Sequence, residues 1–249
     1  MIYEIAQKSI IGGREQQQDS LTVISESDKI FATVCDGMGG HEHGHAASNT
    51  ATDTMTKLYL SKTAEDPYPE FFINAIDILD EKVLSLKSPE MRRLSAGTTI
   101  ITAVISADNL FWMSVGDSRL YIVRKGSIVC VTRDHNYFLS LNQMMENGAI
   151  EKATYDDEAV KGERLISFIG MGGVQIFDVN DTPFKLLPGD TVLLCSDGLY
   201  KAVNDDEILR LVSNNNPAAA MCALFDDSNK TFADNTTCVI IKCNNEVSL

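Results

Sequence analysis

The sequence lacks long apolar runs, and no stretch approaches the roughly 18 consecutive apolar residues that a membrane-spanning helix requires. Its first residues, Met1 to Ile5, also lack the basic start and the apolar segment of a signal peptide. These two absences predict a cytoplasmic protein without membrane contacts.

The chain contains 6 cysteines but no pair with the Cys-x-x-Cys spacing. This absence argues against a zinc ribbon and against a thioredoxin-like site. Disulfides are not expected in a chain without a secretory signal. Cys35, Cys130, Cys195 and Cys238 lie in apolar runs, where a reduced cysteine packs as a small apolar side chain. We expect all the cysteines to be reduced.

Basic residues are scarce, because 21 Lys and Arg stand against 35 Asp and Glu and give a formal net charge of −14. Such a surface repels the phosphate backbone of nucleic acids, so no nucleic-acid partner is expected. Most of the acidic residues are explained as a solvated surface. Only the acids at unusual positions require another explanation.

Internal repeats and Pro- or Gly-rich linkers are also absent, so the 249 residues predict a single domain with one sizeable core. Short apolar runs bounded by Gly, Asp, Asn or Ser indicate strands. Asp108-Asn109 and Lys125-Gly126 are typical of hairpin turns. The predicted strands are Ser20–Ser25, Lys29–Cys35, Thr98–Ser106, Leu110–Val115, Leu120–Arg124, Ser127–Thr132, Thr191–Ser196 and Thr236–Lys242.

Apolar residues spaced three and four apart indicate helices between these strands. Antiparallel strands combined with paired helices predict an α+β fold rather than a parallel sheet. The region from about Glu151 to Gly173 has no clear period and is interpreted as a mobile flap or irregular loop, and the flap as a whole is placed at about residues 136–173. The predicted helices are Ala46–Ser61, Pro69–Leu86, Asn136–Asn147, Asp205–Val212 and Pro217–Phe225.

Four aspartates stand at the ends of predicted strands: Asp36 and Asp197 end two of them, and Asp19 and Asp234 precede two others. Any one of them could be a turn or cap residue. As a set they have no matching group of Lys or Arg, and Asp36 and Asp197 are each followed by a glycine that lets the backbone approach a ligand closely. Oxygen ligands suit Mg²⁺ or Mn²⁺ better than zinc.

These aspartates belong to a series of short motifs that resembles the metal-dependent Ser/Thr protein phosphatases (the PPM, or type 2C, family), especially the compact bacterial members. The resemblance spans residues 14 to 240. The motifs, in chain order, are Arg14-Glu15-Gln16-Gln17-Gln18-Asp19, Asp36-Gly37-Met38-Gly39-Gly40-His41, Ser95-Ala96-Gly97-Thr98-Thr99, Val115-Gly116-Asp117-Ser118-Arg119, Thr132-Arg133-Asp134-His135, Ser196-Asp197-Gly198 and Asp234-Asn235-Thr236.

The resemblance implies a sandwich of two antiparallel β-sheets flanked by pairs of α-helices, in four αββα layers. It also implies two Mn²⁺ or Mg²⁺ ions and hydrolysis of phosphoserine and phosphothreonine by a water that bridges both ions. The implied partners are phosphorylated proteins, with a Ser/Thr kinase as the opposing enzyme, and a monomer is expected.

The resemblance assigns a role to six residues of the chain. Asp36 matches the acid that bridges both ions, and the Gly37 carbonyl is a further ligand. Asp197 and Asp234 match the remaining side-chain ligands of the first ion. Asp19 matches an acid that holds the second ion through water. Arg14 matches the arginine that binds the phosphate.

Two positions depart from the family pattern. Some eukaryotic relatives carry a histidine, proposed as the general acid, where this chain has Met38, so that water is left to protonate the leaving alkoxide. Bacterial relatives often bind a third metal through three acids. Two of them match Asp134 and Asp197, but the position of the other acid is occupied by Lys201 in this chain. A cation at that position predicts a weak or absent third site.

Several alternatives stay open at this point. His41, His43 and His45 fit either a metal cluster or a polar loop, and the polar loop is favoured. Asp117 and Arg119 fit a turn-stabilising pair at least as well as a catalytic one. The sequence also fits a catalytically weak relative that only binds phosphoproteins, or a small-molecule phosphatase. Neither a Cys-x₅-Arg motif nor a Gly-x-Ser-x-Gly motif occurs, so a covalent route is not supported.

Overall fold

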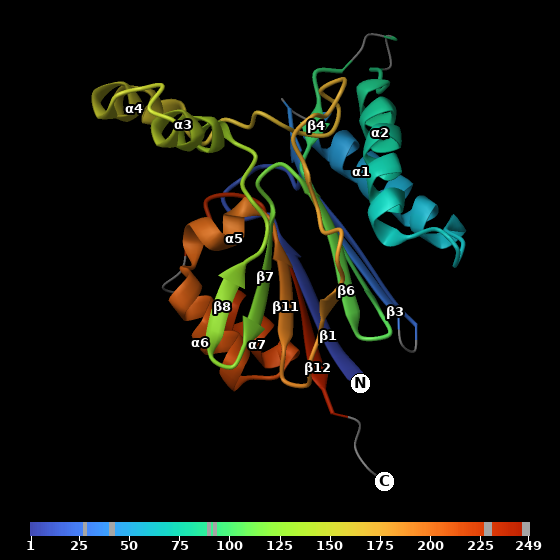
Figure 1. Cartoon of the computed structure of the whole chain (residues 1–249). Helices are drawn as coiled ribbons and strands as arrows, with labels where there is room; N and C mark the ends of the chain where they lie inside the picture. Colours follow the sequence, from blue (N-terminus) through green and yellow to red (C-terminus); the bar gives the residue numbers. More distant parts are fainter. Residues whose placement is uncertain (27–28, 40–42, 89–90, 92–93, 227–230, 246–249) are drawn as a thin grey trace.

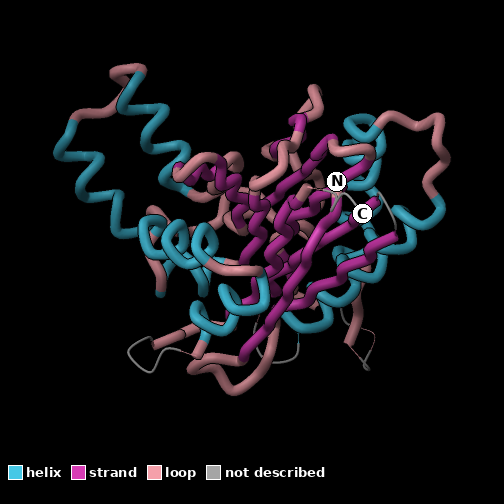
Figure 2. The backbone as a smooth tube through the Cα atoms, turned by 90° about the horizontal axis from the view of Figure 1, so that it is seen from below, coloured by secondary structure: helices cyan, strands magenta, loops and turns pink. Residues whose placement is uncertain are grey.

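A computed structural model describes residues 1–26, 29–39, 43–88, 91, 94–226 and 231–245. Two antiparallel sheets lie face to face, with helices on both outer sides (Figure 1). Seen from below, the strands form the middle of the molecule and the helices its flanks (Figure 2). The predicted α+β sandwich is confirmed.

The first sheet joins the two ends of the chain, because Ile2 lies opposite Asn244 and Ile10 lies opposite Thr236. Its strand order is β1-β12-β11-β7-β8. These strands are β1 (Ile2–Ile10), β12 (Thr236–Asn244), β11 (Thr191–Cys195), β7 (Arg119–Arg124) and β8 (Ser127–Cys130).

The second sheet has the strand order β10-β6-β5-β3-β2, with two short strands beside this path. Side chains alternate along β3: Ile30 and Val34 pack between the two sheets, whereas Phe31 packs against the helices. The strands are β10 (Phe184–Lys185), β6 (Asn109–Val115), β5 (Ile100–Ser106), β3 (Lys29–Met38) and β2 (Asp19–Glu26), with β4 (Gly97–Thr98) beside β3 and β9 (Asp178–Val179) beside β6.

The helices cover the outer faces of both sheets. Helices α1 (His43–Ser61) and α2 (Tyr68–Leu84) pack on the second sheet, and α5 (Asp197–Ala202), α6 (Asp205–Asn214) and α7 (Pro217–Phe225) pack on the first. None of the helices in the described ranges combines the length and apolar character that a membrane span needs.

Helices α3 (Tyr137–Glu146) and α4 (Lys152–Glu158) form a hairpin that projects from the sandwich (Figure 1). Tyr155 Oη donates to Asn142 Oδ1 at 2.8 Å and joins the two helices. The hairpin lies within the segment interpreted as a flap.

Most predicted strands and helices correspond to observed ones within a few residues, and the differences have local causes. The hairpin turn placed at Asp108-Asn109 is one residue out, since Ser106 pairs with Asn109 and the turn is Ala107-Asp108. The predicted strand at 98–106 is interrupted at Thr99 and gives β4 and β5. Strands β1, β9 and β10 and helices α4 and α5 do not correspond to any predicted element. Helix α4 lies inside the region that had no clear period.

Candidate metal centre

The aspartates singled out in the sequence come together at one end of the sandwich. Asp19 begins β2 and lies directly opposite Asp36 on β3, Asp197 follows β11, and Asp234 precedes β12. Antiparallel pairing brings these positions to one edge although they span most of the chain.

A cavity of about 460 Å³ lies at this edge and is called the acidic cavity below. Its walls include Arg14, Asp36, Asp117, Asp197 and Asp234. Asp19 is not part of this wall and is 5% exposed. Three larger cavities of about 510, 650 and 850 Å³ among the described residues contain none of these aspartates, so the chemistry belongs to the acidic cavity.

The backbone of Asp36 is fixed by three hydrogen bonds. Its N–H donates to Thr99 Oγ1 at 3.0 Å, and its carbonyl accepts from Thr99 N and Thr98 Oγ1, both at 2.9 Å. The Thr99 hydroxyl lies 2.7 Å from that of Ser118. The backbone that carries the Asp36 side chain is therefore held in place at the end of β3.

Gly37 is required by close packing at this strand end. A Cβ at this position would lie 2.1 Å from the Gly44 carbonyl oxygen and 2.7 Å from that of Gln18. Any side chain would push α1 and the preceding loop away from β3, so the sequence Asp36-Gly37 keeps the cavity closed on this side.

Asn235 anchors the loop that carries Arg14. Its Nδ2 donates to the carbonyls of Ile11 at 2.8 Å and Gln16 at 2.9 Å, and its Oδ1 accepts from Gln18 N at 2.8 Å. These bonds tie the loop to the start of β12 and place Arg14 beside Asp234. Asn235 stands in the motif Asp234-Asn235-Thr236, but nothing in the sequence indicates this anchoring role.

Burial and mutual repulsion raise the pKa of three carboxyl groups. Loss of water contact raises the pKa of Asp19 to about 6, with Ser196 and Thr237 opposing the shift. Burial raises the pKa of Asp117 to about 7, with a further rise from Asp197. Burial, followed by Asp19 and Asp197, raises the pKa of Asp36 well above its ordinary range. The site therefore carries more negative charge than its surroundings neutralise.

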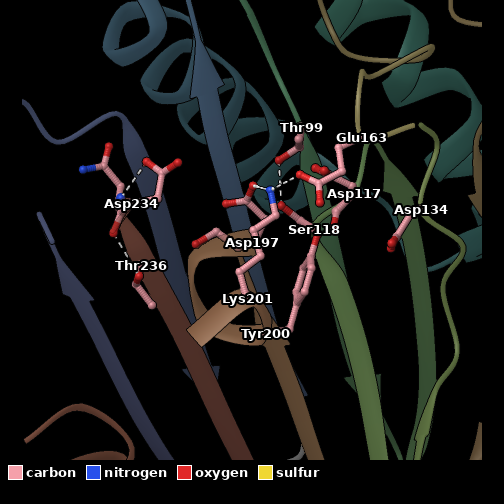
Figure 3. A network of polar contacts seen from close by, with 12 residues as sticks. Thr99, Asp117, Ser118, Asp134, Glu163, Asp197, Tyr200, Lys201, Asp234 and Thr236 are labelled. Atoms are coloured by element: carbon pink, nitrogen blue, oxygen red, sulfur yellow. Dashed lines mark hydrogen bonds and ion pairs between the residues drawn. The ribbon is translucent and has the colours of Figure 1, made fainter. Parts of the chain in front are cut away.

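Two carboxylates of the acidic cavity are held by basic side chains. Arg14 donates to Asp234 Oδ2 at 2.6 Å, and Lys201 Nζ lies 2.7 Å from Asp197 Oδ2. Lys201 also lies 3.2 Å from Glu163 Oε2, which belongs to the segment interpreted as a flap. Figure 3 shows Asp117, Asp197, Lys201 and Glu163 gathered together, with Asp234 to one side and Asp134 to the other.

Asp134 is not part of the cavity wall. Arg119 binds both of its oxygens, at 2.9 Å from Nε and 2.6 Å from Nη2. The guanidinium carbon of Arg119 also lies 3.6 Å from the centre of the Tyr200 ring. Both acids considered for a third metal, Asp134 and Asp197, are thus paired with basic groups of the chain itself.

The interpretation of Asp117 and Arg119 as a turn-stabilising pair needs correction. Arg119 pairs with Asp134, and Asp117 instead lines the acidic cavity. Spacing along the chain could not show this, because the partner of Arg119 lies on the segment that follows β8. The sequence does contain one signal, the Gly116-Asp117-Ser118 motif. Its glycine adopts a φ of 101°, a conformation that favours glycine, directly before Asp117.

The histidine cluster falls partly outside the described residues, because His41 is among those not described. His43 begins α1, and His45 Nδ1 lies 3.0 Å from both the Gln17 carbonyl and Asn49 Nδ2. His45 therefore takes part in polar contacts at the start of α1.

The donors of the acidic cavity fit divalent cations. Asp19 Oδ1 and Asp197 Oδ1 are buried and have no hydrogen-bond partner in the described part of the chain. The side-chain atoms proposed to bind a metal are all carboxylate oxygens, the ligands that Mg²⁺ and similar cations prefer. Among the described residues, no three His, Cys, Asp or Glu side chains already converge on one point as a metal site. Asp197 and Asp234 each hold one carboxylate oxygen, Oδ2, against a basic side chain, Lys201 and Arg14 respectively.

The chain is similar to known protein phosphatases over most of its length. The family model described as "Protein phosphatase 2C" matches residues 6–236. The serine/threonine phosphatase stp of Listeria innocua is 25% identical over 240 residues, which cover 93% of this chain and 92% of that protein. The protein phosphatase PhpP of Streptococcus pneumoniae is 24% identical over 238 residues and 94% of each chain.

Solved structures have the same fold. The serine/threonine phosphatase PstP/Ppp of Mycobacterium tuberculosis aligns with a TM-score of 0.79 at 22% identity, over 98% of this chain and 100% of that one. The catalytic domain of PstP in complex with 2 manganese ions aligns with a TM-score of 0.74 at 23% identity, over 98% and 99% of the two chains. At these identities the likeness supports the sandwich architecture.

Proposed function

The chain belongs to the protein phosphatase 2C family, and from this premise we propose that it hydrolyses phosphoserine and phosphothreonine in proteins with two Mn²⁺ or Mg²⁺ ions. One observation carries the proposal: Asp36, Asp197 and Asp234 line one cavity together with Arg14, and the five acidic side chains of that wall outnumber its three basic ones. The similarity over more than nine tenths of the chain to a protein named as a serine/threonine phosphatase supports the substrate class.

The proposed ligands are all present around the acidic cavity. Asp36 would contact both ions, with the Gly37 carbonyl as a further ligand, and Asp197 and Asp234 would complete the first ion. Asp19 would act through water. When bound, such ions supply positive charge beside the phosphate and a nucleophile at neutral pH.

Arg14 is proposed to bind the substrate phosphate. Its side chain is 59% exposed and one of its terminal nitrogens contacts Asp234, while a guanidinium carries five N–H donors in a planar fork. The same fork that now contacts a carboxylate can bind two phosphate oxygens. Asn235 positions Arg14 through the loop that it anchors.

Met38 carries no ionisable proton at the position that follows Asp36-Gly37. The leaving alkoxide is therefore proposed to take its proton from solvent. The physiological opponent of such an enzyme is a Ser/Thr kinase.

The test uses the purified protein and a phosphothreonine peptide. We expect phosphate release with Mn²⁺, loss of release with a chelator, and loss in Asp197→Asn. The matched control is Asp205→Asn, which removes the charge of an exposed aspartate at the start of α6 and should keep the activity. Activity that survives chelation, or no release from any phosphopeptide, would overturn the proposal.

A further inference from the structure

A second cavity, of about 510 Å³, adjoins the acidic cavity and is called the apolar cavity below. The two cavities share Met38, Gly39 and Phe168 in their walls. A molecule that fills the acidic cavity therefore has the apolar cavity beside it.

The two cavities differ in chemical character. The side chains that line the apolar cavity include Met38, Leu94, Ala96, Phe168 and Met171, and no described residue of its wall carries a charge. The acidic cavity contains several carboxylates and three basic side chains. Ser95 and the backbone of the glycines supply the polar groups of this wall, so a charged side chain would lose water there without gaining a counter-charge. An apolar side chain would instead gain contacts with the apolar side chains of the wall.

The far wall of the apolar cavity is held in place by a buried carboxylate. Asp80 on α2 is 5% exposed and accepts from the N–H groups of Gly170 at 2.6 Å, Gly172 at 3.3 Å and Gly173 at 2.6 Å. All three glycines have positive φ angles, of 99°, 88° and 107°, which favour glycine at each position. The loop is thus fixed before any ligand arrives.

The near part of the same loop is joined to β4. Ile169 exchanges two backbone hydrogen bonds with Thr98, at 3.0 and 2.9 Å. The Phe168 ring lies against Gly97, where an added Cβ would come within 2.5 Å of the ring. Met171 remains 39% exposed at the cavity. A preformed apolar wall of this kind binds a side chain without an ordering cost for the protein.

We propose that the apolar cavity binds an apolar side chain of the phosphoprotein substrate, one or two residues from the phosphorylated serine or threonine. The inference rests on the proposed function, because the phosphorylated residue must occupy the acidic cavity. Neighbouring residues of an extended chain follow at about 3.3–3.6 Å each, so a residue close in sequence reaches the adjoining cavity. Methionine side chains such as Met38 and Met171 adapt to different apolar shapes, which fits a preference for apolar residues in general.

The test compares two phosphothreonine peptides that differ only in the two residues on each side of the phosphothreonine. One peptide has leucine at these positions and the other has asparagine, which is similar in size and also uncharged. We expect kcat/KM to be about 10-fold higher for the leucine peptide, mainly through KM, since burying one leucine side chain is worth roughly that factor. Met171→Ala should bring the ratio most of the way to one.

The matched control is Met145→Ala, which shortens a methionine of similar exposure (37% against 39% for Met171) on α3 outside the cavity wall. It should keep the full preference. Equal rates for the two peptides in the unmodified protein, or an equal loss of preference in both variants, would overturn the inference. Hydrolysis of p-nitrophenyl phosphate with Mn²⁺ separates the two failures: its presence together with equal peptide rates leaves the proposed function standing, and its absence removes both.

Discussion

The carboxylates contributed by the second sheet differ from those contributed by the first in how their charge is neutralised. Asp19 and Asp36, on β2 and β3, form no ion pair within the described residues. Asp134, Asp197 and Asp234, beside strands of the first sheet, are held by Arg119, Lys201 and Arg14 respectively.

This difference indicates where added positive charge is most needed. Burial, and after it repulsion from Asp19, raises the pKa of Asp36, and no basic group lies against either carboxylate to oppose the shift in the described part of the chain. Cations of the chain already occupy the acids of the first sheet. The two proposed ions would therefore add the positive charge that the acids around Asp36 lack, and Lys201, which pairs with Asp197, is proposed to take the place of a third ion.

The largest expected effect comes from Asp36→Asn. Activity with Mn²⁺ should fall by more than about 100-fold, because even residues that only support metal ligands cost about 10–100-fold when changed. The metal-free protein should instead become more stable, by about 1 kcal/mol, since a carboxylate whose pKa is raised on folding destabilises the fold at neutral pH. Thermal unfolding in the presence of a chelator measures this gain.

The matched variant for that experiment is Asp197→Asn. It also removes a proposed ligand and should abolish activity, but it breaks the ion pair with Lys201 and so should not stabilise the metal-free protein. Equal changes of unfolding temperature in Asp36→Asn and Asp197→Asn would show that the two sheets do not differ as described.

The next effect concerns the number of bound ions. We expect the unmodified protein to bind two Mn²⁺ ions, and Lys201→Asp to bind a third, because the change removes a cation and adds an oxygen ligand beside Asp197. Isothermal titration and metal analysis of the dialysed protein measure the number per chain. Lys201→Gln is the control, since it removes the cation without adding a carboxylate and should stay at two. Three well-occupied ions in the unmodified protein would contradict the role given to Lys201.

The paired acids also show what the sequence alone could and could not predict. Asp19, Asp36, Asp197 and Asp234 were identified because each stands at a strand end, and antiparallel pairing brings such ends together. The pairing of Arg119 with Asp134 and the place of Asp117 in the cavity were missed, because they depend on how β7 and the segment after β8 lie side by side.

The missed elements have a similar explanation. Helices α4 and α5 have 7 and 6 residues, which are too few turns to show a helical period. Strand β1 is partly exposed along its length, and among the described strands it pairs with β12 alone, at the other end of the chain. The Lys125-Gly126 turn was predicted correctly because positive φ at both residues, 51° and 78°, is a local property that glycine signals.

The smallest expected effect compares the two ends of β7, where two arginines make the same kind of bidentate contact. Arg119 binds Asp134 at the metal end, and Arg124 binds Asp190 at 2.9 and 2.6 Å at the opposite end. Lysine cannot make either contact with two nitrogens, so Arg119→Lys and Arg124→Lys should each lower the free energy of unfolding by about 1–2 kcal/mol. Urea denaturation measures both losses.

Of the two variants, only Arg119→Lys, at the end of β7 that carries the metal centre, should lower the activity. Arg119 also stacks on Tyr200 of α5, the helix that begins with Asp197, and the Tyr200 hydroxyl donates to the Asp117 carbonyl at 3.1 Å. Loosening this contact shifts a proposed metal ligand, so kcat/KM should fall a few-fold in Arg119→Lys and stay unchanged in Arg124→Lys. Equal activities in the two variants would mean that Arg119 supports the first sheet in the same way that Arg124 does, and that the charge pairing around Asp134 is independent of the metal centre.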